Sequence, residues 1–370
     1  DKRLSQDVVN NTANPDRSHW RYAPLLPVNS PPENTSIQVG GTPLISVPRL
    51  AAELGLDQLW IKDDSRNPSG SLKDRASDTG LRHAQEGGHS RLIAASTGNA
   101  AASLAALGAH RGAEIIILAP ASAPRAKLAQ ILQHGATLIL VDGTYDEAFD
   151  LSLELSRNHG IYSRNTGINP VLSEGKKTVA LEILEQRNWV VPDAVFVPVG
   201  DGCILGGVYK GFHDLYQMGW TEGFPQLMAV QAEGSDAVIR AWETGQVETV
   251  KAQTIADSIA VDLPRDWRKA VRALNATQGH GIRVTDNEIL DAQALCSATT
   301  GLFMEPAAAA ALAGCLRAVN NGQIHTGDEV ILLMTGSGLK DIPAALKQMK
   351  IPTPLEPRLD AVENQLALSS

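Results

Sequence analysis

The sequence predicts an α/β protein of two domains, each an open twisted sheet with flanking helices. From about Leu59 onward, short runs rich in Val, Ile and Leu alternate with longer segments of helical period, which is typical of a parallel sheet with crossover helices. The chain has 370 residues, of which 43% are hydrophobic, so it can bury a large core. That length favours two domains over one.

The expected elements follow one another along the chain. Strands are predicted at residues 58–62, 91–95, 114–119, 137–141, 194–199, 227–231 and 329–334. Residues 1–39, rich in Pro, Asn and Ser, are expected to form an extended strap anchored by Trp20 and Tyr22. Residues 307–316 are mostly alanine and too few to cross a bilayer, so we expect a closely packed helix. The Pro-rich segment from Ile351 is expected to be loosely ordered.

Composition narrows the class of protein. The formal net charge of -9 argues against nucleic-acid binding, which depends on clustered Lys and Arg. Cys203, Cys296 and Cys315 lack the paired spacing of zinc or redox motifs, so no metal is predicted and a reducing compartment fits best. Residues 1–20 show no secretory signal. We therefore expect a cytoplasmic protein with small-molecule partners and no membrane association.

Three turns rich in glycine and hydroxyl residues follow predicted strands. They are Ser96-Thr97-Gly98-Asn99, Gly200-Asp201-Gly202 and Thr335-Gly336-Ser337-Gly338. In open parallel sheets, ligands bind in the crevice beyond the carboxyl ends of the strands. We therefore expect the three turns to meet at one site.

Lys73 lies in the first turn of a predicted helix. The helix dipole disfavours a cation there, by about 0.3–1 kcal/mol if the side chain is exposed. A lysine whose ammonium is destabilised deprotonates more easily, as Schiff-base formation with an aldehyde requires. From its position alone, the favoured interpretation is a solvent-facing lysine paired with Asp74.

Four motifs resemble those of threonine synthases in order and spacing. They are Ser71-Leu72-Lys73-Asp74-Arg75, Ser96-Thr97-Gly98-Asn99, Glu305-Pro306-Ala307 and Thr335-Gly336-Ser337-Gly338-Leu339-Lys340-Asp341. Each motif alone is weak, but four in register are specific, and the likeness runs from about Gly41 to Asp341. Threonine synthases belong to the tryptophan-synthase-β-like class (fold type II) of pyridoxal-phosphate enzymes. The resemblance implies pyridoxal 5'-phosphate as cofactor, a larger domain (1–88 and 176–370), a smaller mobile domain that grips the substrate (89–175), and a homodimer.

The resemblance also implies a role for each site residue. Lys73 would hold the cofactor as a Schiff base and then move protons at the substrate carbons. Asn99 would lie beside the cofactor's 3-hydroxyl and Thr335 would face its ring nitrogen. The loop around the cofactor phosphate would be Gly200, Asp201, Gly202, Cys203 and Ile204. The substrate would be bound by Ser96, Thr97, Gly98, Asn169 and Lys176.

Other interpretations of the same residues stay open. Ser96 could simply cap the following helix. Gly200 and Gly202 follow a predicted strand and open a helix, as in a dinucleotide fold, although Gly206 is one position late for GxGxxG. An oxidoreductase that binds NAD(P), or a protein that binds pyridoxal phosphate without turnover, are therefore minor alternatives.

Three positions depart from the threonine synthase pattern. Leu172 stands where the family has an arginine that can bind the substrate phosphate bidentately. Ala100 replaces a hydroxyl residue, and Asp201, where asparagine is frequent, would repel a phosphorylated substrate. The missing positive charge could come from nearby basic residues, each of which could equally be a solvated surface side chain: Arg125, Arg164, Lys176 and Lys177.

The leading prediction is a lyase that converts O-phosphohomoserine and water to threonine and phosphate. The alternative is β-elimination or β-replacement on serine, threonine or O-phosphoserine, without a site for a substrate phosphate. Hydroxy-amino-acid dehydratases and cysteate synthase exemplify that chemistry. Both sets of reactions begin with loss of the α-proton, so they can share one scaffold.

Overall fold

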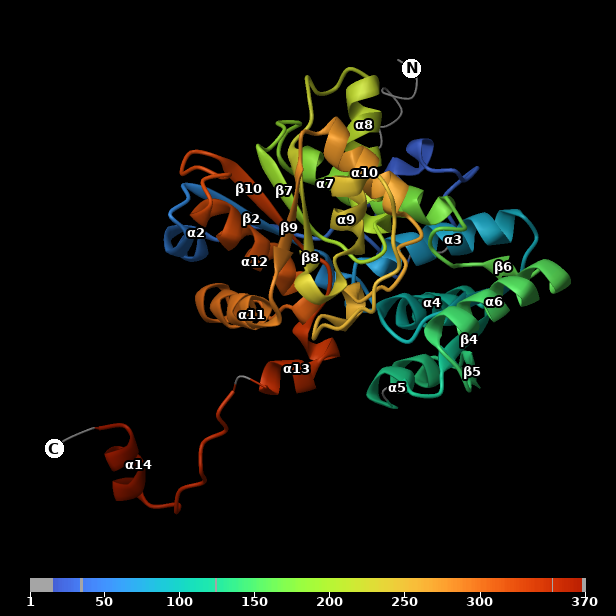
Figure 1. Cartoon of the computed structure of the whole chain (residues 1–370). Helices are drawn as coiled ribbons and strands as arrows, with labels where there is room; N and C mark the ends of the chain where they lie inside the picture. The colour runs from blue at the N-terminus through green and yellow to red at the C-terminus, as the bar shows by residue number, and fades with distance from the viewer. Residues whose placement is uncertain (1–15, 34–35, 124, 348, 368–370) are drawn as a thin grey trace.

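Two sheets organise the chain (Figure 1). The computed structural model describes residues 16–33, 36–123, 125–347 and 349–367. Within them the larger sheet has the strand order β1-β2-β10-β7-β8-β9 and the smaller sheet the order β5-β4-β3-β6. Neighbouring strands are parallel except β1 and β2. The larger sheet consists of β1 (Leu44–Ser46), β2 (Gln58–Asp63), β7 (Ala194–Pro198), β8 (Gln226–Ala232), β9 (His280–Val284) and β10 (Glu329–Met334). The smaller one consists of β3 (Arg91–Ala95), β4 (Glu114–Pro120), β5 (Thr137–Val141) and β6 (Tyr162–Ser163).

All seven predicted strands are present, with ends within one residue of those expected. Three further strands, β1, β6 and β9, were not predicted. β1 and β6 are short, and β1, β6 and β9 each lie at the edge of a sheet. Their sequences therefore lack the long apolar run that a strand buried on both faces requires.

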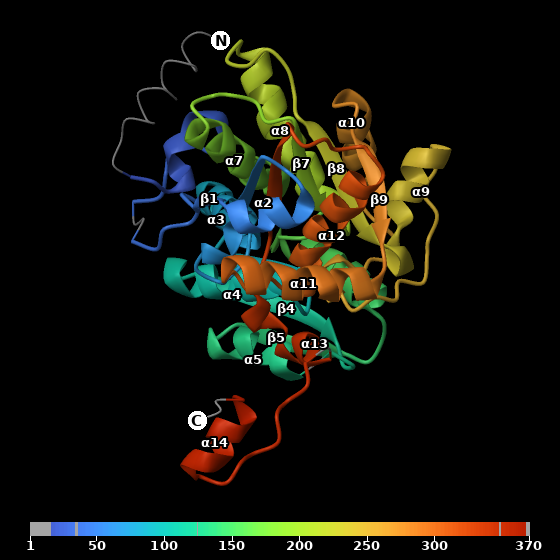
Figure 2. The same ribbon diagram turned by 90° about the vertical axis from the view of Figure 1, so that its left-hand side faces the viewer.

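Helices cover both faces of the larger sheet (Figures 1 and 2). One face packs against α2 (Pro48–Leu54), α11 (Asp286–Thr300) and α12 (Pro306–Asn320), and the other against α7 (Val171–Gln186), α8 (Cys203–Gln217) and α10 (Trp267–Ala276). Alternate residues of β10 enter the two cores: Val330 and Leu332 face α12, whereas Ile331 and Leu333 face α7 and α8. The alanine-rich segment 307–316 is the buried part of α12, as predicted.

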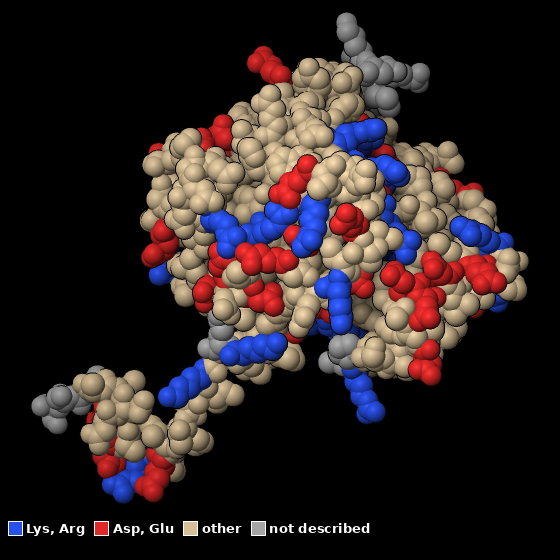
Figure 3. Space-filling view, in the orientation of Figure 1, with Lys and Arg blue, Asp and Glu red and all other residues tan. Residues whose placement is uncertain are grey.

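The smaller sheet is covered in the same way. Leu92 of β3 packs with α4 (Asn99–Arg111) and α5 (Arg125–Gln133), whereas Ile93 packs with α6 (Tyr145–His159). Acidic side chains of α6 gather on the right of the face shown in Figure 3. Between the two sheets lies α3 (Lys73–Glu86), which contacts both α4 and α7. The domain boundaries at residues 88 and 175 stay a prediction.

The remaining elements are short. They are the 3-10 helices η1 (His19–Leu25), η2 (Asp64–Arg66), η3 (Glu233–Ser235), η4 (Asp257–Ile259) and η5 (Gly338–Lys340), and the helices α9 (Ala237–Thr244), α13 (Ile342–Leu346) and α14 (Leu359–Gln365). No helix in the described ranges is both long and apolar enough to cross a membrane.

The two ends of the described chain differ. Trp20 and Tyr22 are buried as predicted, and Trp20 Nε1 donates a hydrogen bond to Asp78 Oδ2 of α3 (2.7 Å). The surrounding strap was expected to be extended, but residues 19–25 form η1. Its first part, residues 1–15, lies outside the described residues, as do residues 34–35. After α13 the chain runs away from the body, and α14 buries none of its residues (Figures 1 and 2).

Candidate active site

A cavity of about 360 Å³ opens where the strands of the two sheets end. Its walls include the turn after β3, the turn after β7, the start of α3 and one residue of α7. Eleven of the predicted site residues line it: Lys73, Ser96, Thr97, Gly98, Asn99, Lys176, Gly200, Asp201, Gly202, Cys203 and Ile204. A smaller recess shares Lys73, Asn99 and Ile204 with this cavity and adds Thr335 and Glu305. The three turns therefore meet, as their positions after parallel strands predict.

Lys73 is the first residue of α3 and opens to the cavity. The preceding segment is pinned to the end of β10, because the Leu72 N–H donates to the Thr335 carbonyl (2.9 Å). Burial, followed by the positive charges of Lys176 and Arg164, lowers the pKa of Lys73 to about 8. A larger fraction of this amine is therefore unprotonated near neutral pH than for an ordinary lysine, which favours imine formation with an aldehyde.

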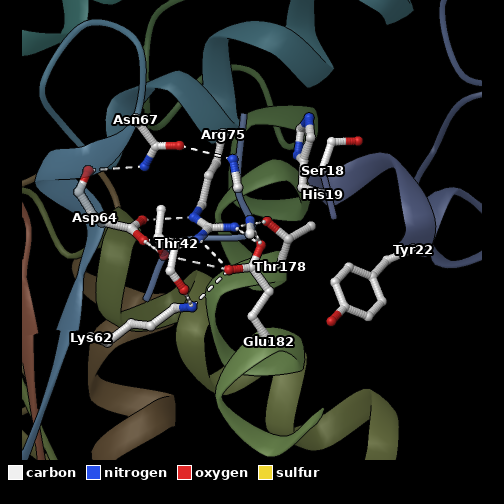
Figure 4. A network of polar contacts seen from close by, with 12 residues as sticks. Ser18, His19, Tyr22, Thr42, Lys62, Asp64, Asn67, Arg75, Thr178 and Glu182 are labelled. Atoms are coloured by element: carbon white, nitrogen blue, oxygen red, sulfur yellow. Dashed lines mark hydrogen bonds and ion pairs between the residues drawn. The ribbon is translucent and has the colours of Figure 1, made fainter. Parts of the chain in front are cut away.

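A buried network of charges fixes the start of α3 (Figure 4). Arg75, two residues after Lys73, donates to both oxygens of Asp64 (2.6 and 2.8 Å) and to both oxygens of Glu182 on α7 (2.6 and 2.8 Å). Lys62 of β2 donates to Glu182 Oε2 (2.7 Å). Two cations and two carboxylates thus neutralise one another inside the protein, which a buried ionic cluster requires. The network thus joins β2, α3 and α7 two residues after Lys73 in the chain.

Asn99 is held by a buried carboxyl group. Its Nδ2 lies 2.9 Å from each oxygen of Glu305 and 3.3 Å from Ser258 Oγ. Burial raises the pKa of Glu305. Gly336 leaves room for this carboxyl group, because a Cβ on Gly336 would lie 2.3 Å from Glu305 Oε1. In the same loop, Ser96 Oγ accepts a hydrogen bond from the Gly98 N–H (3.3 Å), so the hydroxyl stabilises the turn that leads into α4.

The turn after β7 needs glycine for two reasons. Gly202 has φ +92°, and a Cβ there would lie 2.9 Å from the Asp266 carbonyl oxygen. The next residue, Cys203, begins α8, so the free N–H groups of the first turn of α8 lie at this end of the cavity. A glycine turn that leads into a helix N-terminus suits a phosphate. Asp201 Oδ1 accepts hydrogen bonds from the Arg265 N–H (2.6 Å) and the Asp266 N–H (3.3 Å), and its expected effect on a phosphorylated substrate stays a prediction.

The four basic residues that could replace the missing arginine have different surroundings. Arg164 and Lys176 line the cavity and are buried. Arg164 donates to Ser77 Oγ (3.1 Å), and burial lowers its pKa to about 10. Lys177 is paired with Glu174 and Asp214 away from the cavity, and Arg125 is exposed on α5.

Leu172 and Asn169 do not line the cavity. Leu172 is fully buried between α7 and α3, where its Cδ2 would lie 3.1 Å from a Cβ on Gly80. The Asn169 side chain donates to the Ser163 carbonyl (2.9 Å) and accepts from the Val171 N–H (3.1 Å), so its polar atoms serve the turn before α7.

Several lining residues carried no signal in the sequence. Tyr145, Asp146 and Phe149 come from α6, and Arg265 comes from the segment before α10. Arg265 donates to Asp146 Oδ1 (3.1 Å) and lies over the Phe149 ring, 4.8 Å from its centroid. These contacts join the larger and smaller sheets across the cavity. No motif predicts them, because their relation depends on how the two sheets pack.

Comparison with known proteins gives consistent results. A family model described as pyridoxal-phosphate dependent enzyme matches residues 35–336. Threonine synthase of Methanocaldococcus jannaschii is 37% identical over 341 residues, which cover 91% of this chain and 84% of that protein. Threonine synthase of Methanosarcina acetivorans is 36% identical over 353 residues, covering 94% and 86%. The solved structure of the processed form of threonine deaminase isoform 2 from Solanum lycopersicum matches with a TM-score of 0.72 at 22% identity, covering 91% and 85%. The predicted fold class and the predicted cofactor, pyridoxal phosphate, are thereby confirmed. The dinucleotide-binding interpretation of Gly200 and Gly202 is not supported.

Proposed function

Because the chain belongs to the family of pyridoxal-phosphate dependent enzymes, we propose that it is a lyase that converts O-phosphohomoserine and water to threonine and phosphate. The similarity to threonine synthases, which extends over more than 90% of the chain, supports this reaction. The observation that carries the proposal is a group of three basic side chains in the cavity that form no ion pair with a carboxylate among the described residues.

Four basic side chains line the cavity, and one of them, Arg265, pairs with Asp146. The other three are Lys73, Arg164 and Lys176. Among the described residues, none of them forms an ion pair with a carboxylate; Arg164 donates to Ser77 and to a carbonyl, and Lys176 donates to the Cys203 sulfur. A buried cation without a counter-ion is costly, so the ligands should supply the negative charge. A cofactor phosphate together with a substrate that carries a carboxylate and a phosphate meets this need.

Each anion has a suitable part of the cavity. The turn of residues 200–204 and the N-terminus of α8 suit the cofactor phosphate. The turn of Ser96, Thr97 and Gly98 at the start of α4 suits the substrate carboxylate. The Arg164 guanidinium can bind two phosphate oxygens. Arg164 therefore takes the role of the phosphate-binding arginine that the family has at the position of Leu172.

Bound pyridoxal phosphate supplies an electron sink for negative charge that develops on the substrate carbons. The residues of the chain bind, orient and move protons. Lys73 holds the aldehyde carbon and exchanges protons at Cα and Cβ, for which a pKa of about 8 is well matched to neutral pH. Asn99, fixed by Glu305, would hold the 3-hydroxyl of the cofactor, and Thr335 would offer the ring nitrogen a hydroxyl that does not enforce ring protonation.

A second candidate is elimination or replacement at Cβ of serine, threonine or O-phosphoserine. Asp201, in the turn proposed to bind the cofactor phosphate, favours this candidate. Its Oδ2 atom is buried and has no hydrogen-bond partner among the described residues. A carboxylate there disfavours a second phosphate in the cavity.

One assay separates the two candidates. Purified protein saturated with pyridoxal phosphate is given O-phosphohomoserine, O-phosphoserine, serine and threonine in parallel, and phosphate, threonine and ammonia are measured. We expect phosphate and threonine in equal amounts from O-phosphohomoserine, and none from the Lys73→Ala variant. Ammonia from serine or threonine, without phosphate from O-phosphohomoserine, would reject the first candidate and favour the second.

The assembly is part of the same proposal. We expect a cytoplasmic homodimer that associates through the larger domain, with the smaller domain moving onto the substrate. Light scattering of the purified protein should give twice the chain mass of 39.3 kDa. A monomer mass at micromolar concentration would contradict the dimer.

A further inference from the structure

Cys203 and Lys176 form a close pair inside the cavity. Cys203 begins α8 and Lys176 lies on α7, and Lys176 Nζ is 2.6 Å from Cys203 Sγ. The two residues are 3% and 0% exposed, and both line the cavity. No other hydrogen-bond partner of Lys176 Nζ occurs in the described part of the chain. The amine is therefore directed at the sulfur.

The other two cysteines have different surroundings. Cys296 lies on α11, where its sulfur is 3.4 Å from Thr300 Oγ1, and Cys315 lies inside α12. Burial raises the pKa of both thiols, and neither lines the cavity. Cys296 and Cys315 therefore serve as internal controls for the oxidation of Cys203.

We propose that Cys203 and Lys176 are a reversible oxidative modification site, at which a peroxide joins the cysteine sulfur to the lysine nitrogen. First, the sulfur attacks hydrogen peroxide, the O–O bond breaks, and a sulfenic acid and water form. Then the amine attacks the sulfur, the S–O bond breaks, and the hydroxyl group leaves with an amine proton as a second water. The pair loses two hydrogen atoms and the peroxide is reduced to two waters. Two thiols reverse the link and are oxidised to one disulfide.

The link has a structural consequence. It ties α7 to the first residue of α8, beside the turn of residues 200–204, and it removes the Lys176 amine from the set of charges around Lys73. The oxidised protein should therefore bind pyridoxal phosphate less tightly. This loss of affinity rests on the role proposed for residues 200–204, whereas the link itself does not depend on the reaction catalysed.

The test is peptide mapping of the full-length holoenzyme after treatment with hydrogen peroxide. We expect one cross-linked species that joins the peptides of Lys176 and Cys203, with a mass about 2 Da below their sum, and its disappearance after dithiothreitol. Cys203→Ser and Cys203→Ala should lack it, whereas Cys296→Ser should retain it. Lys176→Gln should leave a sulfenic acid at Cys203 that dimedone traps.

Three results would each overturn the proposal. Cys203 could remain reduced under peroxide that oxidises a small-molecule thiol completely. It could reach the sulfinic acid in the wild-type protein without the link. The same loss of about 2 Da could also persist in Lys176→Gln, which would show that another amine reacts. The first two results are read from wild-type peptides, so neither depends on how well a variant folds.

Discussion

The buried network behind Lys73 makes a quantitative prediction for the variant Glu182→Gln. The carboxylate of Glu182 accepts hydrogen bonds from Arg75 (2.6 and 2.8 Å), Lys62 (2.7 Å) and the Gly41 N–H (2.8 Å). Without its charge, two buried cations face the single carboxylate of Asp64. Removing one partner of a buried ion pair costs about 3–5 kcal/mol. We expect the free energy of unfolding, measured by urea denaturation of the cofactor-saturated protein, to fall by that amount.

The control is an ion pair of the same type at the surface. Arg91 and Glu114 pair with side chains that are 61% and 50% exposed, so Glu114→Gln should cost roughly 0–1 kcal/mol. Burial alone would raise the pKa of Glu182, but Arg75 and Lys62 hold it well below its ordinary value. A carboxylate with a lowered folded-state pKa stabilises fully above its unfolded pKa, and that contribution is lost as the pH falls towards the folded pKa. The difference in the free energy of unfolding between wild type and Glu182→Gln should therefore become smaller below about pH 4.5. Equal losses in the two variants at pH 7 would refute the reasoning.

Three more predictions concern the cavity. Imine formation between pyridoxal phosphate and the cofactor-free protein, followed by absorbance, should have its midpoint near pH 8 and be lost in Lys73→Ala, whereas an ordinary lysine would require about pH 10.4. Arg164→Gln should lower kcat/KM for O-phosphohomoserine at least about 30-fold, since a buried charge pair is worth about 2–5 kcal/mol. The control variant Arg125→Gln should leave kcat/KM unchanged. An unchanged value for Arg164→Gln would show that Arg164 does not bind the phosphate. Gly202→Ala should weaken the binding of pyridoxal phosphate, measured by fluorescence titration. The control is Gly55→Ala, which should not weaken it, because Gly55 has φ +70° but open space around it. Similar affinities in the two variants would contradict the close approach proposed for Gly202.

The fold was largely predictable because its central strands are buried on both faces. β10 shows this: all six of its residues are buried, and residues 330–334 form a continuous apolar run whichever core each side chain enters. β9 was missed because His280, Gly281 and Arg283 interrupt the apolar residues, which is possible at the edge of a sheet. Its pairing with β8 depends on tertiary contacts that a local pattern does not contain.

The candidate site was predictable where it depends on turns after strands, and less so where it depends on packing. The turns at Ser96 and Gly200 lie after parallel strands, so their meeting follows from topology. Sequence alone could not separate Arg164 from Arg125, because one follows β6 into the interior and the other lies on an exposed helix. Leu172 was recognised as a departure, but its position between α7 and α3 required the structure.

The buried charges of the network and those of the cavity differ in one respect, and this difference explains their different roles. In the network, Lys62 and Arg75 meet Asp64 and Glu182, so the cluster is neutral and complete without a ligand. At the cavity, Lys73, Arg164 and Lys176 form no ion pair with a carboxylate among the described residues, so this set is complete only when anions bind. The first set can therefore fix the start of α3 in the absence of ligand. The second set can supply binding energy to phosphate and carboxylate groups at a position that is already fixed.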